Sequence, residues 1–444
     1  MFPSRHIDRH LNAHLMPILG LGFMAVSIGC VEPDKDRPWS TRHQSVSGFS
    51  EQPDPTPQAN RSSEAHQPSG AIERSIEVAS ISSEPDTPAN ISREDQDEPT
   101  VELRISTEEI VRPDENPNRS WTLDGDTSES RAISWLQQAV FDDYAMVRAY
   151  AFEAMEHRPP LLEAYAGNGL VDENRGVRFV TTMAIGRTCL GTLTPLIEPG
   201  LLDPSLSVKA ATIYALRELG QPVDPSSLAA MTMGEDPEVR GNAYMVLGML
   251  GNPTAVPVID ASLGQGMRLR NPMRIRITEL QAAEALVMLG DQVEVEPIRA
   301  ALFSPVEQGE LTVLACDMLG RLQDEQARPM LMRLILAEGN ERRPPEIRVA
   351  AANAILRLPP PHEDGLEKVI LEYADAENPL LRTQVASALA AGPSPEARKT
   401  LDRLLGDENP IVRTAAAGAL LERAAAASES PKGTFQSTTA TVPD

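Results

Sequence analysis

The sequence predicts an all-α fold, an α-solenoid of about nine helical hairpins preceded by a disordered linker. The first observation is a helical phrase that recurs nine times, with successive starts 30, 31, 31, 39, 33, 36, 34 and 31 residues apart. Such a period is typical of stacked repeats. The second observation is a long polar, acidic segment ahead of the phrase, which lacks the apolar residues of a core. The phrases start at Val147, Val177, Val208, Val239, Thr278, Leu311, Ile347, Leu381 and Val412.

Residues 1–29 are predicted to be a signal peptide. Arg5 and Arg9 precede the apolar run LMPILGLGFMAVSIG, which is too short to span a bilayer comfortably. The run ends in SIG followed by Cys30, a pattern that resembles the lipobox of bacterial lipoproteins. The resemblance implies lipidation of Cys30, export and anchoring to a membrane. A plain secretory signal with a coincidental cysteine is the alternative.

The residue after Cys30 bears on localisation. It is Val31, whereas aspartate is the usual signal for retention in the inner membrane of well-studied envelopes. We therefore expect the protein at the outer membrane, facing the periplasm. Whether the solenoid faces the periplasm or the cell surface stays open.

Residues 30–129 are predicted to be a disordered acidic tether rich in serine, proline and glutamate. Between residues 31 and 130 there are 22 acidic and 9 basic residues. A segment of this composition cannot bury enough apolar surface to offset the entropy of ordering. The tail, residues 426–444, is again polar and is predicted to be disordered.

Residues 130–425 are predicted to form the solenoid. Within each phrase the apolar positions fall at offsets 0, 4, 7, 8 and usually 11, which is one face of a helix. A shorter apolar stretch precedes each phrase, so each repeat is a hairpin of a first and a second helix. Turns such as Asp236-Pro237 and Asn409-Pro410 place a capping side chain and a proline at a helix start. Stacking the hairpins would bury a continuous core.

The phrase resembles a known family. Its Asp-Pro turn, Val-Arg start and Ala-rich body, as in VRGNAYMVLGMLG from Val239 and VRTAAAGALLER from Val412, are similar to HEAT repeats. The short period is closest to the PBS-lyase HEAT-like subtype. The resemblance implies an α-solenoid that serves as a binding surface for other proteins. It implies no particular activity, because such repeats are general-purpose surfaces.

A cation usually occupies the second position of the phrase. In HEAT repeats the equivalent cation commonly bonds to acids of the turn between the two helices, and the resemblance implies a structural Asp–Arg ladder here. Thr278-Glu279 and Leu311-Thr312 break the pattern, so the fifth and sixth hairpins should be joined differently. The cations are Arg148, Arg178, Lys209, Arg240, Arg348, Arg382 and Arg413, and the acids are Asp172, Asp203, Asp236 and Asp407.

Two lengthened turns are the candidate partner-binding sites. The step from Val239 to Thr278 is eight residues longer than the one before it, and the excess lies in the turn GQGMRLRNPMRIR. A second turn, EGNERRPPEIR, is also lengthened. We expect both on one rim, where arginine flanked by apolar residues suits an acidic protein or a lipid headgroup. Solvated loops, or loops that contact the acidic tether, are the alternatives. The arginines are Arg268, Arg270, Arg274, Arg276, Arg342 and Arg343.

Charge argues against a nucleic-acid partner. The chain carries 64 acidic residues against 40 lysines and arginines, a net charge of −24. Residues 131–425 alone hold 39 acidic and 28 basic residues. Binding to phosphates requires a basic stripe.

Few residues suit catalysis or metal binding. Only His157 and His362 fall in the predicted solenoid, so we expect no metal site and no cofactor. His362-Glu363 is a single His-Glu pair, whereas the HEAT-repeat hydroxylase of deoxyhypusine needs several. Cys189 and Cys316 lie in non-adjacent repeats, so we expect two small buried residues and no disulfide. No catalytic residue is assigned.

The sequence therefore indicates a membrane-anchored HEAT-repeat scaffold for protein–protein interaction in the bacterial cell envelope, and not an enzyme. One alternative is a bilin-lyase-like enzyme or lyase partner, which the export signal disfavours. The other is a structural spacer of the envelope. The partner is unknown, and exposed end repeats would permit dimerisation.

Overall fold

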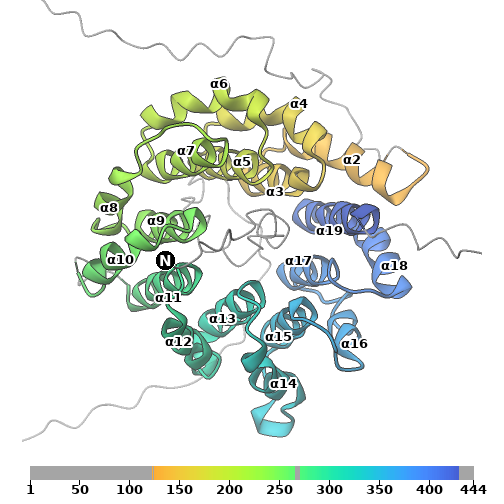
Figure 1. Cartoon of the computed structure of the whole chain (residues 1–444). Helices are drawn as coiled ribbons and strands as arrows, with labels where there is room; N and C mark the ends of the chain where they lie inside the picture. Colours follow the sequence, from red (N-terminus) through yellow and green to blue (C-terminus); the bar gives the residue numbers. More distant parts are fainter. Residues whose placement is uncertain (1–122, 124, 266–270, 430–444) are drawn as a thin grey trace, which may run out of the picture. The chain divides into compact units, whose positions relative to one another are not determined.

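The computed structural model describes residues 123, 125–265 and 271–429. These residues form eighteen α-helices and eight short 3-10 helices, with no strand among them. The predicted all-α fold of stacked hairpins is confirmed (Figure 1). The predicted signal peptide with Cys30, most of the tether and most of the tail lie outside the described residues. None of the described helices is both long and apolar enough to cross a lipid bilayer.

Nine hairpins follow one another. The first helices lie on the outside: α2 (Ser128–Ala139), α4 (Pro159–Leu170), α6 (Thr194–Ile197), α8 (Ser226–Thr232), α10 (Val256–Ser262), α12 (Val295–Ala301), α14 (Arg328–Leu336), α16 (Leu366–Leu371) and α18 (Pro395–Leu404). The second helices lie on the inside: α3 (Ala145–Ala154), α5 (Arg175–Arg187), α7 (Leu206–Glu218), α9 (Pro237–Leu250), α11 (Pro272–Met288), α13 (Gly309–Arg321), α15 (Pro345–Arg357), α17 (Pro379–Ala388) and α19 (Pro410–Glu429).

The 3-10 helices lie in the connections. In the third hairpin, η2 (Gly191–Leu193) and η3 (Glu198–Leu202) flank a four-residue α6, so the first helix there is broken. The others are η1 (Met155–His157), η4 (Pro253–Ala255), η5 (Gln292–Glu294), η6 (Val306–Gln308), η7 (Glu325–Ala327) and η8 (Gly339–Glu341).

Polar residues and prolines start several second helices, as the turn sequences indicate. Asp236 caps α9 by accepting a hydrogen bond from the backbone N–H of Glu238 at 2.9 Å, and Asn378 caps α17 in the same way through Leu380. A proline follows each of these caps, where its missing N–H would have had no helical partner.

The core runs through the stack along the apolar face of the second helices. All nine side chains at offset 8 of the phrase are buried, from Met155 in the first hairpin to Leu420 in the last. Small residues let the helices approach closely, since a Cβ built on Gly186 would lie 2.8 Å from the Cα of Ala215 in the next hairpin. Large and small residues therefore alternate across each interface, as close packing requires.

The described hairpins close into a ring. Each second helix packs against the next, and α19 of the last hairpin packs against α2 and α3 of the first (Figure 1). Across this seam the indole Nε1 of Trp135 donates to Thr414 Oγ1 at 3.0 Å, and Arg131 lies 3.4 Å from Asp402. The expectation of exposed end repeats is wrong, because the two end hairpins cover each other.

Candidate functional site

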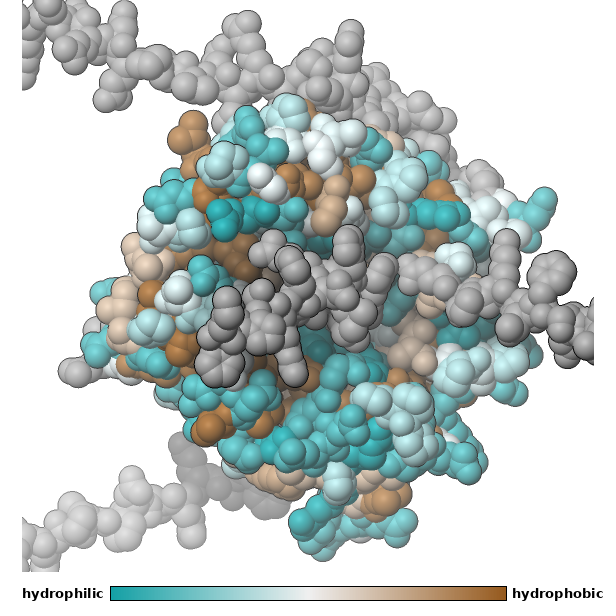
Figure 2. Space-filling model, in the orientation of Figure 1, coloured by the Kyte–Doolittle hydropathy of each residue, from teal (hydrophilic) through white to brown (hydrophobic). Residues whose placement is uncertain are grey.

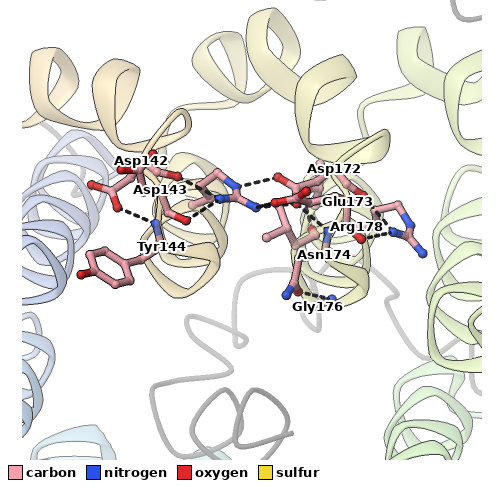
Figure 3. A network of polar contacts seen from close by, with 11 residues as sticks. Asp142, Asp143, Tyr144, Asp172, Glu173, Asn174, Gly176 and Arg178 are labelled. Atoms are coloured by element: carbon pink, nitrogen blue, oxygen red, sulfur yellow. Dashed lines mark hydrogen bonds and ion pairs between the residues drawn. The ribbon is translucent and has the colours of Figure 1, made fainter. Parts of the chain in front are cut away.

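Arginines at the second position of the phrase join neighbouring turns (Figure 3). Arg148 donates two parallel hydrogen bonds to Asp172, Nε to Oδ2 at 2.7 Å and Nη2 to Oδ1 at 2.8 Å. Its Nη1 donates to the carbonyl oxygens of Asp142 and Asp143 in its own turn, at 2.9 and 3.2 Å. The hydrogen bonds to Asp172 hold the pKa of Arg148 above its usual value. The same fork joins Arg178 to Asp203 and Arg382 to Asp407, at 2.8 to 3.0 Å.

The acids of these pairs also shape the turns in which they lie. Asp172 Oδ1 accepts a hydrogen bond from the backbone N–H of Asn174 at 2.8 Å, and Asn174 caps α5 through Gly176 (Figure 3). The side chains of Arg148 and Asp172 are only 11% and 10% exposed. Guanidinium and carboxylate are thus engaged by the protein itself, which is the arrangement of a structural ladder.

Five members of the proposed ladder are placed differently, four of them within the stack and the fifth, Arg413, at the seam. Arg240 is fully buried and donates to the carbonyl oxygens of Gln265, Ser262 and Gly234 instead of a carboxylate. The lengthened fifth turn brings carbonyls, and no acid, to that position. Arg348 donates to the hydroxyl of Tyr373. Asp236 is a helix cap with no ladder contact, and Lys209 makes no ion pair with another described residue.

The fifth and sixth hairpins are joined differently, since their phrases lack the cation. Thr278 turns its hydroxyl back to the carbonyl of Arg274 at 2.9 Å. Thr312 donates to the carbonyl of Ala301 at 3.3 Å. A substitute ion pair forms elsewhere, between Arg299 of α12 and Asp324, with Nε 2.6 Å from Oδ2.

A second set of ion pairs joins neighbouring second helices. Arg321 of α13 lies 2.8 Å from Glu284 of α11, and Arg357 of α15 lies 2.8 Å from Asp317 of α13. In each pair the acid occupies offset 6 of one phrase and the cation offset 10 of the next. Sequence reasoning missed these pairs, although the recurrence of this spacing is a usable signal.

The seam holds the last member of the ladder. The guanidinium carbon of Arg413 lies 4.0 Å from the centroid of the Trp135 ring, a cation–π contact. Asp142 occupies the place in the first turn that Asp172 occupies in the second, and it accepts the backbone N–H of Tyr144 at 2.8 Å. Burial raises the pKa of Asp142, while the positive charges of Arg148 and Arg413 oppose that rise. Arg413 thus contacts an aromatic ring where Arg148 and Arg178 contact a carboxylate, and its Nε atom is buried without a hydrogen-bond partner.

A small cavity of about 50 Å³ opens beside this seam, between α3, α17 and α19. Its lining includes Glu153 and His157 from the first hairpin and Glu422 from the last. The Oε2 atom of Glu422 is buried without a hydrogen-bond partner. Burial raises the pKa of Glu153 to about 8 and that of Glu422 to about 7. Both carboxyls therefore keep a proton well above the pH at which exposed glutamates lose theirs.

This protonation predicts that the ring loses stability as the pH rises. Unfolded glutamates titrate near 4.5, so between that pH and about 8 the native state holds protons that the unfolded state has released. Stability from both groups is complete below pH 4.5 and is lost up to about pH 8. A Glu153→Gln, Glu422→Gln variant lacks this loss, so its Tm should rise relative to wild type between pH 5 and pH 8.

Other charged groups also act on the pKa values of these two carboxyls. Glu156, Arg187 and Asp317 act on Glu153, and Arg357 and Arg423 act on Glu422. They are the same in both proteins, so the difference between the two Tm curves isolates the pair. Parallel curves from pH 5 to pH 9 would contradict the prediction.

Two of the six candidate partner-binding arginines lie beside acids of the protein itself. Arg342 lies 3.2 Å from Glu372 in the next turn, and exposed Arg276 lies 3.7 Å from Glu279 of its own helix. Arg274 and Arg343 are partly buried at the two lengthened turns. Arg268 and Arg270 lie outside the described residues.

Exposed apolar side chains mark one edge of the ring. We call this edge the turn rim: it consists of the turns between the first and second helix of each hairpin, with the adjoining helix ends. Of the eleven exposed large apolar side chains among the described residues, ten lie on the turn rim and one, Val293, lies on the opposite edge. The ten are Tyr144, Val171, Leu202, Leu206, Met233, Leu263, Phe303, Val306, Leu336 and Leu380, and they represent each of the first eight hairpins.

These side chains are spread around the rim instead of being gathered in one patch. Consecutive hairpins lie about 8–10 Å apart, so the rim offers an apolar contact at each such step. Figure 2 shows hydrophobic and hydrophilic residues interspersed over the face turned to the viewer. Single exposed apolar residues are ordinary on a protein surface, but here ten of the eleven share one edge.

The cysteines of the described residues lie apart from each other and form no cluster with histidines. Cys316 is buried, and burial raises the pKa of its thiol. Cys189 is exposed after the end of α5, so the expectation that both cysteines are buried is wrong for Cys189. Its backbone φ of 53° ends the helix and turns the residue outward. Among residues 125–265 and 271–429, no three His, Cys, Asp or Glu side chains are placed to hold a metal ion.

Comparison with known proteins relates part of this chain to a known type of repeat. The family described as HEAT repeats matches residues 366–430, which hold the last two hairpins. The chain has HEAT-repeat character. No curated protein is significantly similar to it in sequence. The structure of human deoxyhypusine hydroxylase in complex with glycerol is 15% identical, covering 67% of this chain and 97% of that one, with a TM-score of 0.29. A likeness of this degree carries no argument about activity.

Proposed function

We propose that this protein is a scaffold of the bacterial cell envelope that binds other proteins on its HEAT repeats, with no catalytic residue, cofactor or nucleic-acid partner. The observation that carries the proposal is the turn rim, where an exposed apolar side chain recurs in each of eight successive hairpins. The ladder and the ion pairs between second helices are engaged within the protein, whereas the turn rim exposes apolar side chains that no other part of the described chain covers. An extended surface of repeated contacts suits an elongated partner.

The same proposal includes anchoring. The lipobox-like end at Cys30 supports attachment to the envelope, with the outer membrane and its periplasmic face as the expected place. A tether of about a hundred polar residues would let the ring search tens of ångströms from the membrane. The phrase and its short period support the PBS-lyase HEAT-like subtype as the finer class of the repeat.

Crosslinking in the native envelope tests the scaffold. A photo-crosslinking residue in the full chain at Phe303, 47% exposed on the turn rim, should capture a protein adduct of discrete mass. The same residue at Val293, 73% exposed on the opposite edge, should not. The adduct should fractionate with membranes, and a Cys30→Ser chain should leave that fraction.

Two further results would decide between surfaces. A chain with Arg268, Arg270, Arg274 and Arg276 changed to alanine separates the lengthened turn from the apolar rim. Loss of the Phe303 adduct in that chain would place the partner across the fifth turn as well. Equal capture at Phe303 and Val293, or none at Phe303, would count against a scaffold that uses this rim.

A further inference from the structure

We infer that the turn rim takes a basic amphipathic segment, in which lysine or arginine side chains alternate with apolar ones. The inference rests on the proposed scaffold function and names the chemistry of the partner. Its basis is the charge that accompanies the apolar side chains. In several hairpins an exposed carboxylate lies within three residues of an exposed apolar side chain, as Glu307 does beside Val306 and Glu377 beside Leu380.

Exposed charge on the described part of the rim is mostly negative. Twelve exposed carboxylates lie in the described turns or within two residues of them, and they occur in every hairpin except the third and the fifth. The twelve are Asp143, Glu173, Glu235, Asp236, Glu307, Glu310, Glu338, Glu341, Glu372, Asp375, Glu377 and Glu408. A surface of one sign attracts segments of the other and orients them as they approach.

The exposed arginines of the same turns do not cancel this charge. Three of them lie beside carboxylates of the protein itself. Arg175 is 2.9 Å from Glu238, and Arg342 is 3.2 Å from Glu372. Arg276 is 3.7 Å from Glu279. The ladder arginines beneath the rim are likewise held by aspartates and carbonyls. Exposed carboxylates still outnumber exposed arginines and lysines on the described rim, so its net charge is negative.

Exposed apolar side chains and carboxylates lie most densely on the sixth, seventh and eighth hairpins. Phe303, Leu336 and Leu380 are 47%, 66% and 62% exposed, one per hairpin. Lysine and arginine fit such a surface because their aliphatic stems pack on apolar groups while the charged ends reach carboxylates. Three hairpins span about 20–30 Å, which a helix of about 14–20 residues covers.

Other occupants suit this surface less well. The chain's own tether carries 22 acidic residues against 9 basic ones, so the acidic hairpins of the turn rim repel it. Anionic lipid headgroups are repelled for the same reason. The sequence predicted an acidic partner from the arginines of the two lengthened turns. The described rim is instead acidic over the sixth to ninth hairpins, which favours a basic partner there.

Peptide binding to the full chain tests the inference. The probe is a fluorescent peptide of about 18 residues with leucines on one helical face and lysines on the other. Anisotropy is measured near 0.15 M salt, where non-specific attraction is screened. We expect the affinity to fall about ten-fold or more in a Phe303→Ser, Leu336→Ser, Leu380→Ser variant. A Glu307→Gln, Glu338→Gln, Glu377→Gln variant should lose affinity similarly.

A matched control lies on the opposite edge. The Val293→Ser, Glu325→Gln, Asp364→Asn variant removes the same kinds of exposed group and should bind as wild type does. All substituted side chains are exposed, and circular dichroism checks that the helices are retained. Peptides with glutamate for lysine, or serine for leucine, should bind at least about ten-fold more weakly.

The outcomes separate the partner class from the function. Equal losses in the rim and control variants, or tighter binding of the glutamate peptide, would overturn the inference. A Phe303 adduct in cells together with no peptide binding would overturn the basic partner and leave the scaffold standing. Failure of both experiments would remove both.

Discussion

Replacing Trp135 with alanine should destabilise the ring by about 3–5 kcal/mol and open it at its seam. Trp135 is 1% exposed, and it holds the last hairpin through Thr414 and through its contact with Arg413. Alanine leaves a cavity, deprives Thr414 of a donor and leaves a partly buried guanidinium without its ring.

Hydrogen exchange measures this effect where it should be greatest. In the variant, α2, α3 and α19 should lose protection, while hairpins far from the seam keep theirs. Chemical unfolding gives the total loss, with Phe303→Ala as a control in which a half-exposed aromatic is removed at little cost. Unchanged protection of α19 in the Trp135 variant would mean that the seam does not depend on this residue.

Changing Arg240 to alanine should cost about 3 kcal/mol or more. The side chain is 0% exposed, and it donates to the carbonyl oxygens of Ser262, Gln265 and Gly234. Removing it leaves several acceptors without a donor at once, each costing about 1–3 kcal/mol when buried. The loss should centre on the turn between α10 and α11.

Limited trypsin digestion reads out this turn. Cleavage between Leu263 and Asn271 should become faster in the Arg240→Ala protein, well below the temperature of global unfolding. Arg217→Ala, which removes an exposed arginine one hairpin earlier, should leave both the cleavage rate and the stability near wild type. A turn cut at the same rate in all three proteins would show that Arg240 does not hold it.

The repeated phrase made the hairpins predictable, because each copy must bury the same face against its neighbours. The pairs of Arg148 with Asp172 and of Arg382 with Asp407 follow from the same regularity. The contacts of Arg240 could not be predicted, because the eight extra residues of the next turn place carbonyl oxygens where other turns place an aspartate.

Ring closure could not be predicted from the phrase. It depends on the small rotation between neighbouring hairpins, which is set by how closely residues such as Gly186 and Ala215 approach and is not visible in an apolar pattern. Trp135 and Thr414 lie 279 residues apart, and no local spacing links them. The exposed apolar side chains were equally hidden, since in sequence they belong to the ends of otherwise buried helices.

Closure also constrains how this protein can change in evolution. In an open array a hairpin can be duplicated or lost while its neighbours keep their interfaces, so copy number varies readily. Here the rotations between neighbouring hairpins must add up to one full circle. Only then does Arg413 of the last hairpin reach Trp135 of the first. Adding or deleting a single hairpin would leave the ends misaligned and require every interface to rotate. Variation is therefore expected in turn length, as between α10 and α11, and not in the number of repeats.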